Sequence, residues 1–214
     1  MPELAKGLND KFGGLKILTM QNLAASPYKA DAVVLEEIEK LAKSENKKVK
    51  AAAINYLVKN GNIKYLSIYQ AAVNDSSYSV AGAALKGLIA LDEAGAYTLS
   101  KKFSSDAKGA LGAAVNDVLI SSGTEADFEY VSTMYKDAPA SQEKLGLTTK
   151  YAAYLAKLNN MASIKKGIDN IIAFRNLVPA AYRSSVDPSF KASFDKISKA
   201  KGKEIEDYIK VVFN

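Results

Sequence analysis

The sequence predicts an all-α fold arranged as an α-solenoid, in which antiparallel helix pairs stack into a superhelix. Four nine-residue segments align without gaps, each opened and closed by aliphatic residues eight positions apart, and successive segments start 34, 31 and 31 residues apart. No stretch of the 214 residues shows a convincing strand pattern. A repeat of this length that stays helical throughout is typical of stacked helix-pair proteins. The segments are 15–23, 49–57, 80–88 and 111–119.

Each segment is predicted to be the second helix of a pair. The third and fifth positions after the opening aliphatic are apolar or small, apart from Asn116, which matches helical spacing. Small third positions allow stacked helices to approach closely. The signatures of tetratricopeptide and ankyrin repeats need Trp or His, which this chain lacks, so a short HEAT/armadillo-like repeat remains. The opening residues are Leu15, Val49, Val80 and Leu111, and the third positions are Leu18, Ala52, Ala83 and Ala114.

Short polar residues and glycines mark the expected helix ends. Asp10, Ser44, Asp75 and Asp106 each stand five residues before an opening aliphatic, and we expect them to cap the second helices. The first helices of the pairs are expected at 30–43, 63–73 and 94–103. Glycines near helix ends are expected to be C-caps, and glycines inside predicted helices are expected to permit close packing. The first group is Gly61, Gly95 and Gly123, and the second is Gly82, Gly87, Gly109 and Gly112.

Beyond residue 123 the repeat becomes irregular while the helical period persists. Thr124 and Asp127 have the spacing of a capping box, which opens a helix through Tyr135. Long helices are predicted at 141–158 and 161–177, and an amphipathic one at 203–213. Between them, 180–200 is expected to hold a shorter helix and a loop around Asp187–Pro188. We therefore expect two parts: 1–123 with regular HEAT-like repeats, and 124–214 as an irregular helical part of the same array.

Composition excludes several functional classes. The chain has no Cys and no His, which removes thiol nucleophiles, zinc helices of the H-E-x-x-H type and Ser-His-Asp triads. No glycine-rich phosphate loop occurs, and the carboxylates at 36–39 and 204–207 are expected on solvated helix faces. We expect no catalytic residue, metal site or cofactor in this chain alone. No apolar run of about 18 residues predicts a membrane span, so a soluble segment is expected.

The four candidates for binding are Tyr65, Tyr69, Arg175 and Arg183. Tyr65 and Tyr69 lie one turn apart, as do Tyr151 and Tyr154, and they are either anchors on a concave face or residues at the edge of the core. Arg175 and Arg183 are the only arginines, and a guanidinium suits bidentate recognition of a carboxylate or phosphate, with surface ion pairs as the alternative. The net charge of +6 also raises nucleic-acid binding, but the lysines are scattered among acidic residues, which disfavours it.

Residues 9–23 (NDKFGGLKILTMQNL) and 47–92 resemble the C-terminal HEAT-like region of bacterial zinc aminopeptidases. The family is that of aminopeptidase N, or membrane alanyl aminopeptidase (metallopeptidase family M-one), in Bacteroidetes-type bacteria, and the likeness continues to about residue 178. In this family the zinc ligands and a Gly-x-Met-Glu-Asn segment lie in an upstream catalytic domain, and neither occurs here. The helical domain packs over that domain and helps to enclose the peptide cavity.

The resemblance therefore implies a non-catalytic C-terminal piece whose partners are the upstream catalytic domain and its peptide substrate, with zinc in the parent enzyme only. A helix pattern that starts directly after Met1 fits such a piece. The alternative is a free-standing HEAT scaffold for protein–protein binding, and nucleic-acid binding is a further, less favoured one. The compartment stays open, since a periplasmic or secreted parent carries its signal upstream.

Overall fold

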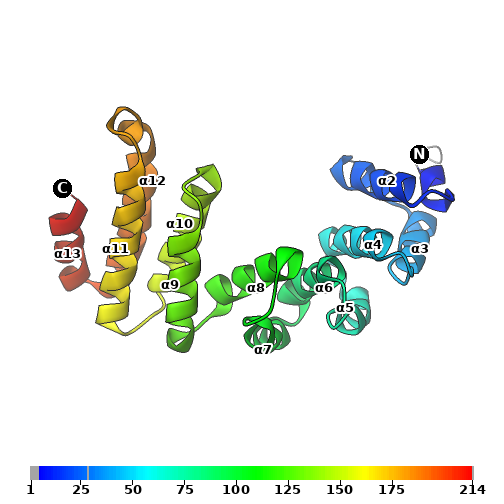
Figure 1. Cartoon of the computed structure of the whole chain (residues 1–214), viewed down its shortest axis with the longest axis horizontal. Helices are drawn as coiled ribbons and strands as arrows, with labels where there is room; N and C mark the ends of the chain where they lie inside the picture. Colours follow the sequence, from blue (N-terminus) through cyan, green and yellow to red (C-terminus); the bar gives the residue numbers. More distant parts are fainter. Residues whose placement is uncertain (1–4, 28, 214) are drawn as a thin grey trace. The chain divides into compact units, whose positions relative to one another are not determined.

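The computed structural model describes residues 5–27 and 29–213, and within them the chain forms twelve α-helices and no strand (Figure 1). The described residues divide into two compact units, with the boundary between Val118 and Leu119. Three short 3₁₀ turns accompany the helices: η1 (Lys6–Asn9), η2 (Ile63–Tyr65) and η3 (Glu125–Asp127). The helices are α2 (Gly13–Ala25), α3 (Ala32–Leu41), α4 (Lys47–Asn60), α5 (Leu66–Ala72), α6 (Tyr78–Leu91), α7 (Glu93–Phe103), α8 (Gly109–Ser122), α9 (Phe128–Asp137), α10 (Gln142–Leu155), α11 (Met161–Leu177), α12 (Ala180–Lys201) and α13 (Lys203–Phe213).

In the first unit, α2, α4 and α6 pack on one another in chain order, and we call them, with α8, the inner helices (Figure 1). Each covers one of the four aligned segments, so the prediction of these helices is confirmed. The helices α3 and α5 pack on the inner helix that follows each of them, and α7 packs on α6. The opening aliphatic residue recurs because it is buried in three of the four inner helices, as Val49, Val80 and Leu111. In the first inner helix the equivalent residue, Leu15, is exposed.

Two glycines permit the close packing that the sequence predicts. A Cβ on Gly82 would lie 2.5 Å from the backbone carbonyl of Ala110, so only a hydrogen fits between α6 and α8 there. A Cβ on Gly87 would lie 2.5 Å from the ring of Tyr69. Gly109 has another role, because it begins α8 with a φ of 53°, a conformation that favours glycine.

The prediction that Asp10, Ser44 and Asp75 are helix caps is wrong. Each side chain accepts a hydrogen bond from the backbone N–H two residues further on, at 2.7, 3.2 and 3.0 Å, and so forms a turn ahead of the helix. The helices begin two residues before the opening aliphatic, so the N-cap lies two residues later than expected. In α4 the cap is Asn46, whose Oδ1 accepts from the N–H groups of Lys48 and Val49. Asp106 accepts a hydrogen bond from the Ser105 hydroxyl.

The expected C-terminal glycines have different outcomes. Gly61 ends α4 in the left-handed conformation, with a φ of 64°, as predicted. Gly123 directly follows α8, and its N–H donates to the Leu119 carbonyl. Gly95 is not a C-cap, because α7 starts at Glu93 and the Gly95 N–H donates to Asp92, the N-cap.

The second unit has an aromatic core. The capping box of Thr124 and Asp127 is present as predicted. The rings of Tyr135 and Tyr151 stack with centroids 4.3 Å apart, and Tyr154 lies 6.4 Å from Tyr151. The helices α10, α11 and α12 pack on one another, and α13 packs on α11 and α12 (Figure 1). The bounds of α11 and α13 agree with the prediction, whereas α10 ends three residues earlier.

The loop predicted around Asp187–Pro188 is wrong, because α12 runs unbroken from Ala180 to Lys201 with Pro188 inside it. An interior proline removes one helical hydrogen bond and costs about 3 kcal/mol. Contacts on both sides of it offset this cost. Asp187 is held by Arg175, and Phe190 and Phe194 are buried one and two turns further on.

Candidate polypeptide-binding groove

One face of the inner helices is exposed at regular positions. The residues one before, six after and ten after each opening aliphatic share a helix face, because they are seven and four residues apart. All of these positions on α2, α4 and α6 are exposed. They are Gly14, Gln21 and Ala25 on α2, Lys48, Asn55 and Lys59 on α4, and Ser79, Lys86 and Ala90 on α6.

A groove with a volume of about 450 Å³ opens on this face, between α2 and α4. Its floor is apolar, formed by Met20, Ala24, Ala51 and Ala52 together with parts of Ile17 and Tyr56. Its rim is polar and holds amide, hydroxyl and ammonium groups. A floor and rim of this kind suit a polypeptide, whose side chains contact the floor while its backbone bonds the rim. The rim residues are Gln21, Asn55, Ser79, Lys48 and Lys59.

The lysines of this face lack the carboxylate partners that Lys40, Lys47, Lys50 and Lys64 of the first unit have. Among the described residues, the side chains of Lys48 and Lys86 make no ion pair or hydrogen bond, and Lys59 Nζ lies 3.5 Å from the Ala24 carbonyl oxygen. By contrast, Lys64 lies 2.7 Å from Glu39, and Lys40 pairs with Glu37. The groove rim therefore carries positive charge that attracts an anionic partner.

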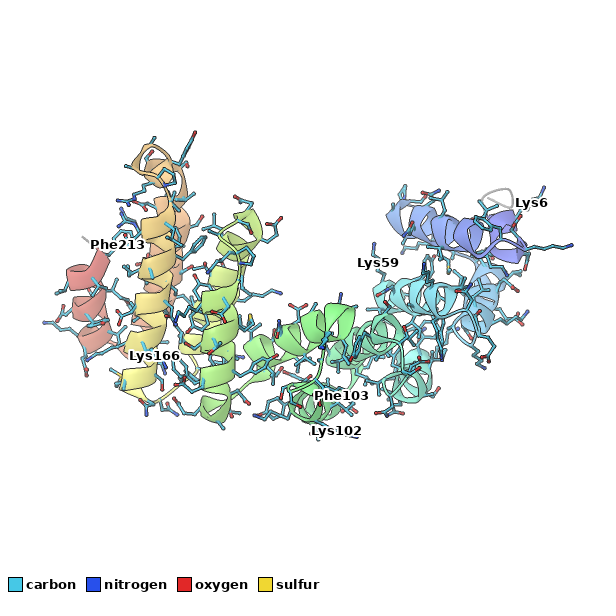
Figure 2. All side chains as sticks on the ribbon, viewed as in Figure 1. Lys6, Lys59, Lys102, Phe103, Lys166 and Phe213 are labelled. Atoms are coloured by element: carbon cyan, nitrogen blue, oxygen red, sulfur yellow. The ribbon has the colours of Figure 1, made fainter. Side chains whose placement is uncertain are left out.

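Lys59 projects from the end of α4, and in this view Lys102 of α7 lies on the other side of the first unit (Figure 2). Lys102 has no carboxylate partner within the described part of the chain either, and its Nζ lies 5.9 Å from the Phe103 ring centroid. It is therefore a matched exposed lysine outside the groove.

Asp75 is the most strongly perturbed acid of the first unit, and its role is structural. Its Oδ2 lies 2.8 Å from Lys47 Nζ and 2.9 Å from Lys50 Nζ, and its side chain is only 5% exposed. Burial raises the pKa of Asp75, but hydrogen bonds from Lys47, the Ser77 N–H and Lys50 outweigh this and hold the pKa well below its usual range. The ion pairs of Lys47 and Lys50 with Asp75 connect the start of α4 to the turn before α6.

The predicted tyrosine candidates lie in the core. Tyr65 and Tyr69 are each 1% exposed, so neither ring is available as an anchor for a partner. Burial, with a smaller contribution from nearby Tyr65, raises the pKa of Tyr69 to about 12, and its buried hydroxyl makes no hydrogen bond within the described residues. Tyr151 and Tyr154 are fully buried as well. These residues therefore fit the interpretation as core residues.

Both arginines bind groups of their own unit. The Arg175 guanidinium holds Asp187 through two bonds of 2.8 and 2.9 Å, donates to the Phe213 carbonyl at 3.1 Å and lies over the Phe213 ring. It thereby holds the pKa of Asp187 below its usual range. Arg183 donates to the carbonyls of Val178 and Asn176 and so satisfies the end of α11.

The second unit has a smaller pocket of about 250 Å³ between the start of α10 and the α11–α12 turn. Leu145, Phe174, Val186 and Phe190 make it largely apolar. Beside Phe174 lies Lys144, which is 5% exposed and donates to the carbonyls of Lys136 and Ala138 at 3.0 and 2.7 Å. Burial lowers the pKa of Lys144. The side chain thus closes the end of α9, and no charged group lines the pocket.

Within residues 5–27 and 29–213, no three acidic side chains gather closely enough to hold a metal ion. None of the helices in this part of the chain is both long and apolar enough to cross a membrane. No family model, curated protein or solved structure matches the chain.

Proposed function

We propose that this chain is the non-catalytic C-terminal helical domain of a zinc aminopeptidase, which packs on the catalytic domain and helps to enclose its peptide cavity. In this proposal the first unit is a short HEAT-like α-solenoid, and the zinc belongs to the upstream domain. The proposal rests on the sequence resemblance and on one structural observation: the groove on the inner helices, with lysines that no carboxylate of the described residues neutralises.

The groove supports a role in contacting peptide for a physical reason. Small side chains such as Ala52 leave room for a backbone, while Asn55 and Ser79 supply hydrogen-bond groups at the edges. Lys48 and Lys59 add long-range attraction for acidic peptides, which raises the rate of encounter more than the affinity. In this role the groove guides the peptide substrate, and the zinc site of the upstream domain cleaves the peptide bond.

A free-standing scaffold is the second candidate, and the same groove favours it, because a groove can hold a segment of a partner protein without a catalytic domain. Nucleic-acid binding has less support. Lys40, Lys47, Lys50 and Lys64 of the first unit pair with carboxylates, which reduces the charge left to contact phosphates.

The reading frame of the gene tests the proposal first. Upstream of Met1 it should encode H-E-x-x-H and a more distant Glu, and the complete polypeptide should bind zinc and release amino-terminal residues from peptides. A gene that begins at Met1 contradicts the proposal. If the chain instead retains a partner protein from native lysate, and that partner has no zinc peptidase activity, the result supports the free-standing scaffold.

Charge reversal in the groove tests the peptide-contacting role. In the complete polypeptide, the double variant Lys48→Glu/Lys59→Glu should raise KM for an acidic peptide on the order of tenfold and leave kcat unchanged, because two attractions become repulsions remote from the zinc. Lys102→Glu is the matched control and should leave KM unchanged. If the double variant and Lys102→Glu change KM equally, the groove does not contact the peptide.

A further inference from the structure

The first inner helix, α2, has an apolar face that the described residues leave open. Leu15 and Leu18 lie one turn apart on it and are 40% and 50% exposed, and Phe12 just before the helix is 73% exposed. The turn η1, which includes buried Leu8, packs on the adjoining turn of the same face, where Gly7 lies against Thr19, and it leaves Leu15 and Leu18 exposed. Two large apolar side chains exposed on one face, with a third at the start of the helix, are typical of an interaction site.

The repeat shows what kind of element belongs there. On the later inner helices the residues equivalent to Leu15 are buried: Val49 is 2% exposed, Val80 0% and Leu111 6%. At Val49 and at Leu111 the inner helix that comes before makes a close contact. A Cβ on Gly13 of α2 would lie 3.2 Å from Val49 Cγ2, and a Cβ on Gly82 of α6 would lie 2.7 Å from the Leu111 nitrogen.

Two of the covering helices present a glycine at the contact: Gly13 of α2 faces the Val49 side chain, and Gly82 of α6 faces the backbone at Leu111. The face of α2 is therefore shaped for a helix, and the same contact continues one step further towards the amino terminus. Lys11 lies four residues before Leu15 and Lys16 one residue after it, and neither pairs with a carboxylate in the part of the chain that the structure describes. Their charge favours acidic side chains at the edge of the incoming helix.

We propose that the apolar face of Phe12, Leu15 and Leu18 binds an amphipathic helix of the polypeptide encoded upstream, in the register in which α2 covers α4. This inference rests on the proposed function and adds the surface through which the two domains meet. The incoming helix has Gly or Ala where it crosses Leu15 and acidic residues towards Lys11 and Lys16.

The absence of cysteine from the chain permits a direct test. Leu18→Cys on α2 is labelled with the polarity-sensitive fluorophore acrylodan, and Val33→Cys on α3, which is 76% exposed, is the matched control. The 214-residue chain is titrated with the separately expressed upstream polypeptide. The emission at position 18 should shift to the blue and saturate, while position 33 should not respond.

A second variant separates docking from misfolding. Leu15→Glu should weaken binding at least tenfold and leave the helical circular dichroism unchanged, because Leu15 is not part of the core. Absence of a blue shift at position 18, or an equal shift at position 33, overturns the inference. A blue shift that grows with the concentration of the chain alone also overturns it, because a second copy then covers the face.

Zinc content and aminopeptidase activity of the upstream polypeptide are measured on the same samples. A blue shift with an upstream polypeptide that lacks zinc activity supports the docking surface and overturns the proposed function. Zinc activity without a blue shift supports the proposed function and overturns the docking surface.

Discussion

Replacement of Gly82 by Ala tests the close packing of the inner helices. The added methyl group would lie 2.5 Å from the carbonyl carbon and oxygen of Ala110 and 2.7 Å from the Leu111 nitrogen. These are backbone atoms, which cannot rotate away as a side chain does. An ordinary contact needs at least 3.4 Å, so α6 and α8 must separate by about 1 Å at this point.

The expected effect is a balance of two contributions. Ala is favoured over Gly inside a helix by about 1 kcal/mol, whereas overpacking typically costs about 1–3 kcal/mol. Because the clash is with backbone, the cost lies at the upper end, and Gly82→Ala should lower the free energy of unfolding by about 2 kcal/mol. At Gly146 of α10 nothing lies within 4 Å of the added Cβ, so Gly146→Ala should raise it by about 0.5–1 kcal/mol.

The assay is urea unfolding followed by circular dichroism, with hydrogen exchange and mass spectrometry to assign each change to α6 or α10. Gly82→Ala should speed exchange in α6 and α8, and Gly146→Ala should slow it in α10. A Gly82→Ala protein as stable as Gly146→Ala refutes the close contact between α6 and α8.

Three further predictions follow from single side chains. Asp75→Asn should destabilise the protein by about 1–3 kcal/mol at pH 7; because folding lowers the pKa of this carboxyl below 3.8, the deficit should shrink as the pH falls from 5 to 2 in urea titrations. Tyr69→Phe should be neutral or stabilising in thermal melts, since its hydroxyl is unpaired, whereas Tyr135→Phe should cost about 1 kcal/mol by breaking the 2.8 Å bond to Thr148; equal effects contradict this. Arg175→Lys should speed hydrogen exchange in α12 and α13, because lysine cannot replace the bidentate bond; unchanged exchange contradicts this.

The elements that the sequence predicts correctly are those with local causes. Apolar residues at helical spacing predict the four inner helices, and the paired side chains of Thr124 and Asp127 predict a capping box without any tertiary information. The glycines at 82 and 87 are also assigned correctly to close packing, because a glycine inside a strongly periodic helix usually needs a neighbour that approaches closely.

The errors come from tertiary contacts and from small shifts at helix ends. Pro188 predicts a break, but the Arg175–Asp187 pair and the buried rings beyond it keep α12 continuous. Asp10 and Asp75 occupy a real recurring position, yet a shift of two residues makes them turn formers and leaves the cap to residues such as Asn46.

The candidate site was the least accessible from the sequence. The spacing of Lys48, Asn55 and Lys59 places them on one helix face, but only packing shows that this face is exposed and lines a groove. Tyr65 and Arg175 attracted attention because of their residue types, and the structure gives both of them partners inside their own units.

Peptide cleavage by the complete polypeptide, with and without these 214 residues, is the most direct test of the proposed role. The complete polypeptide should cleave amino-terminal residues in a zinc-dependent manner, and the version without this chain should lose activity on longer peptides, which addition of the separate chain restores at least in part. Equal cleavage of all peptides by both versions contradicts the role as a wall of the peptide cavity.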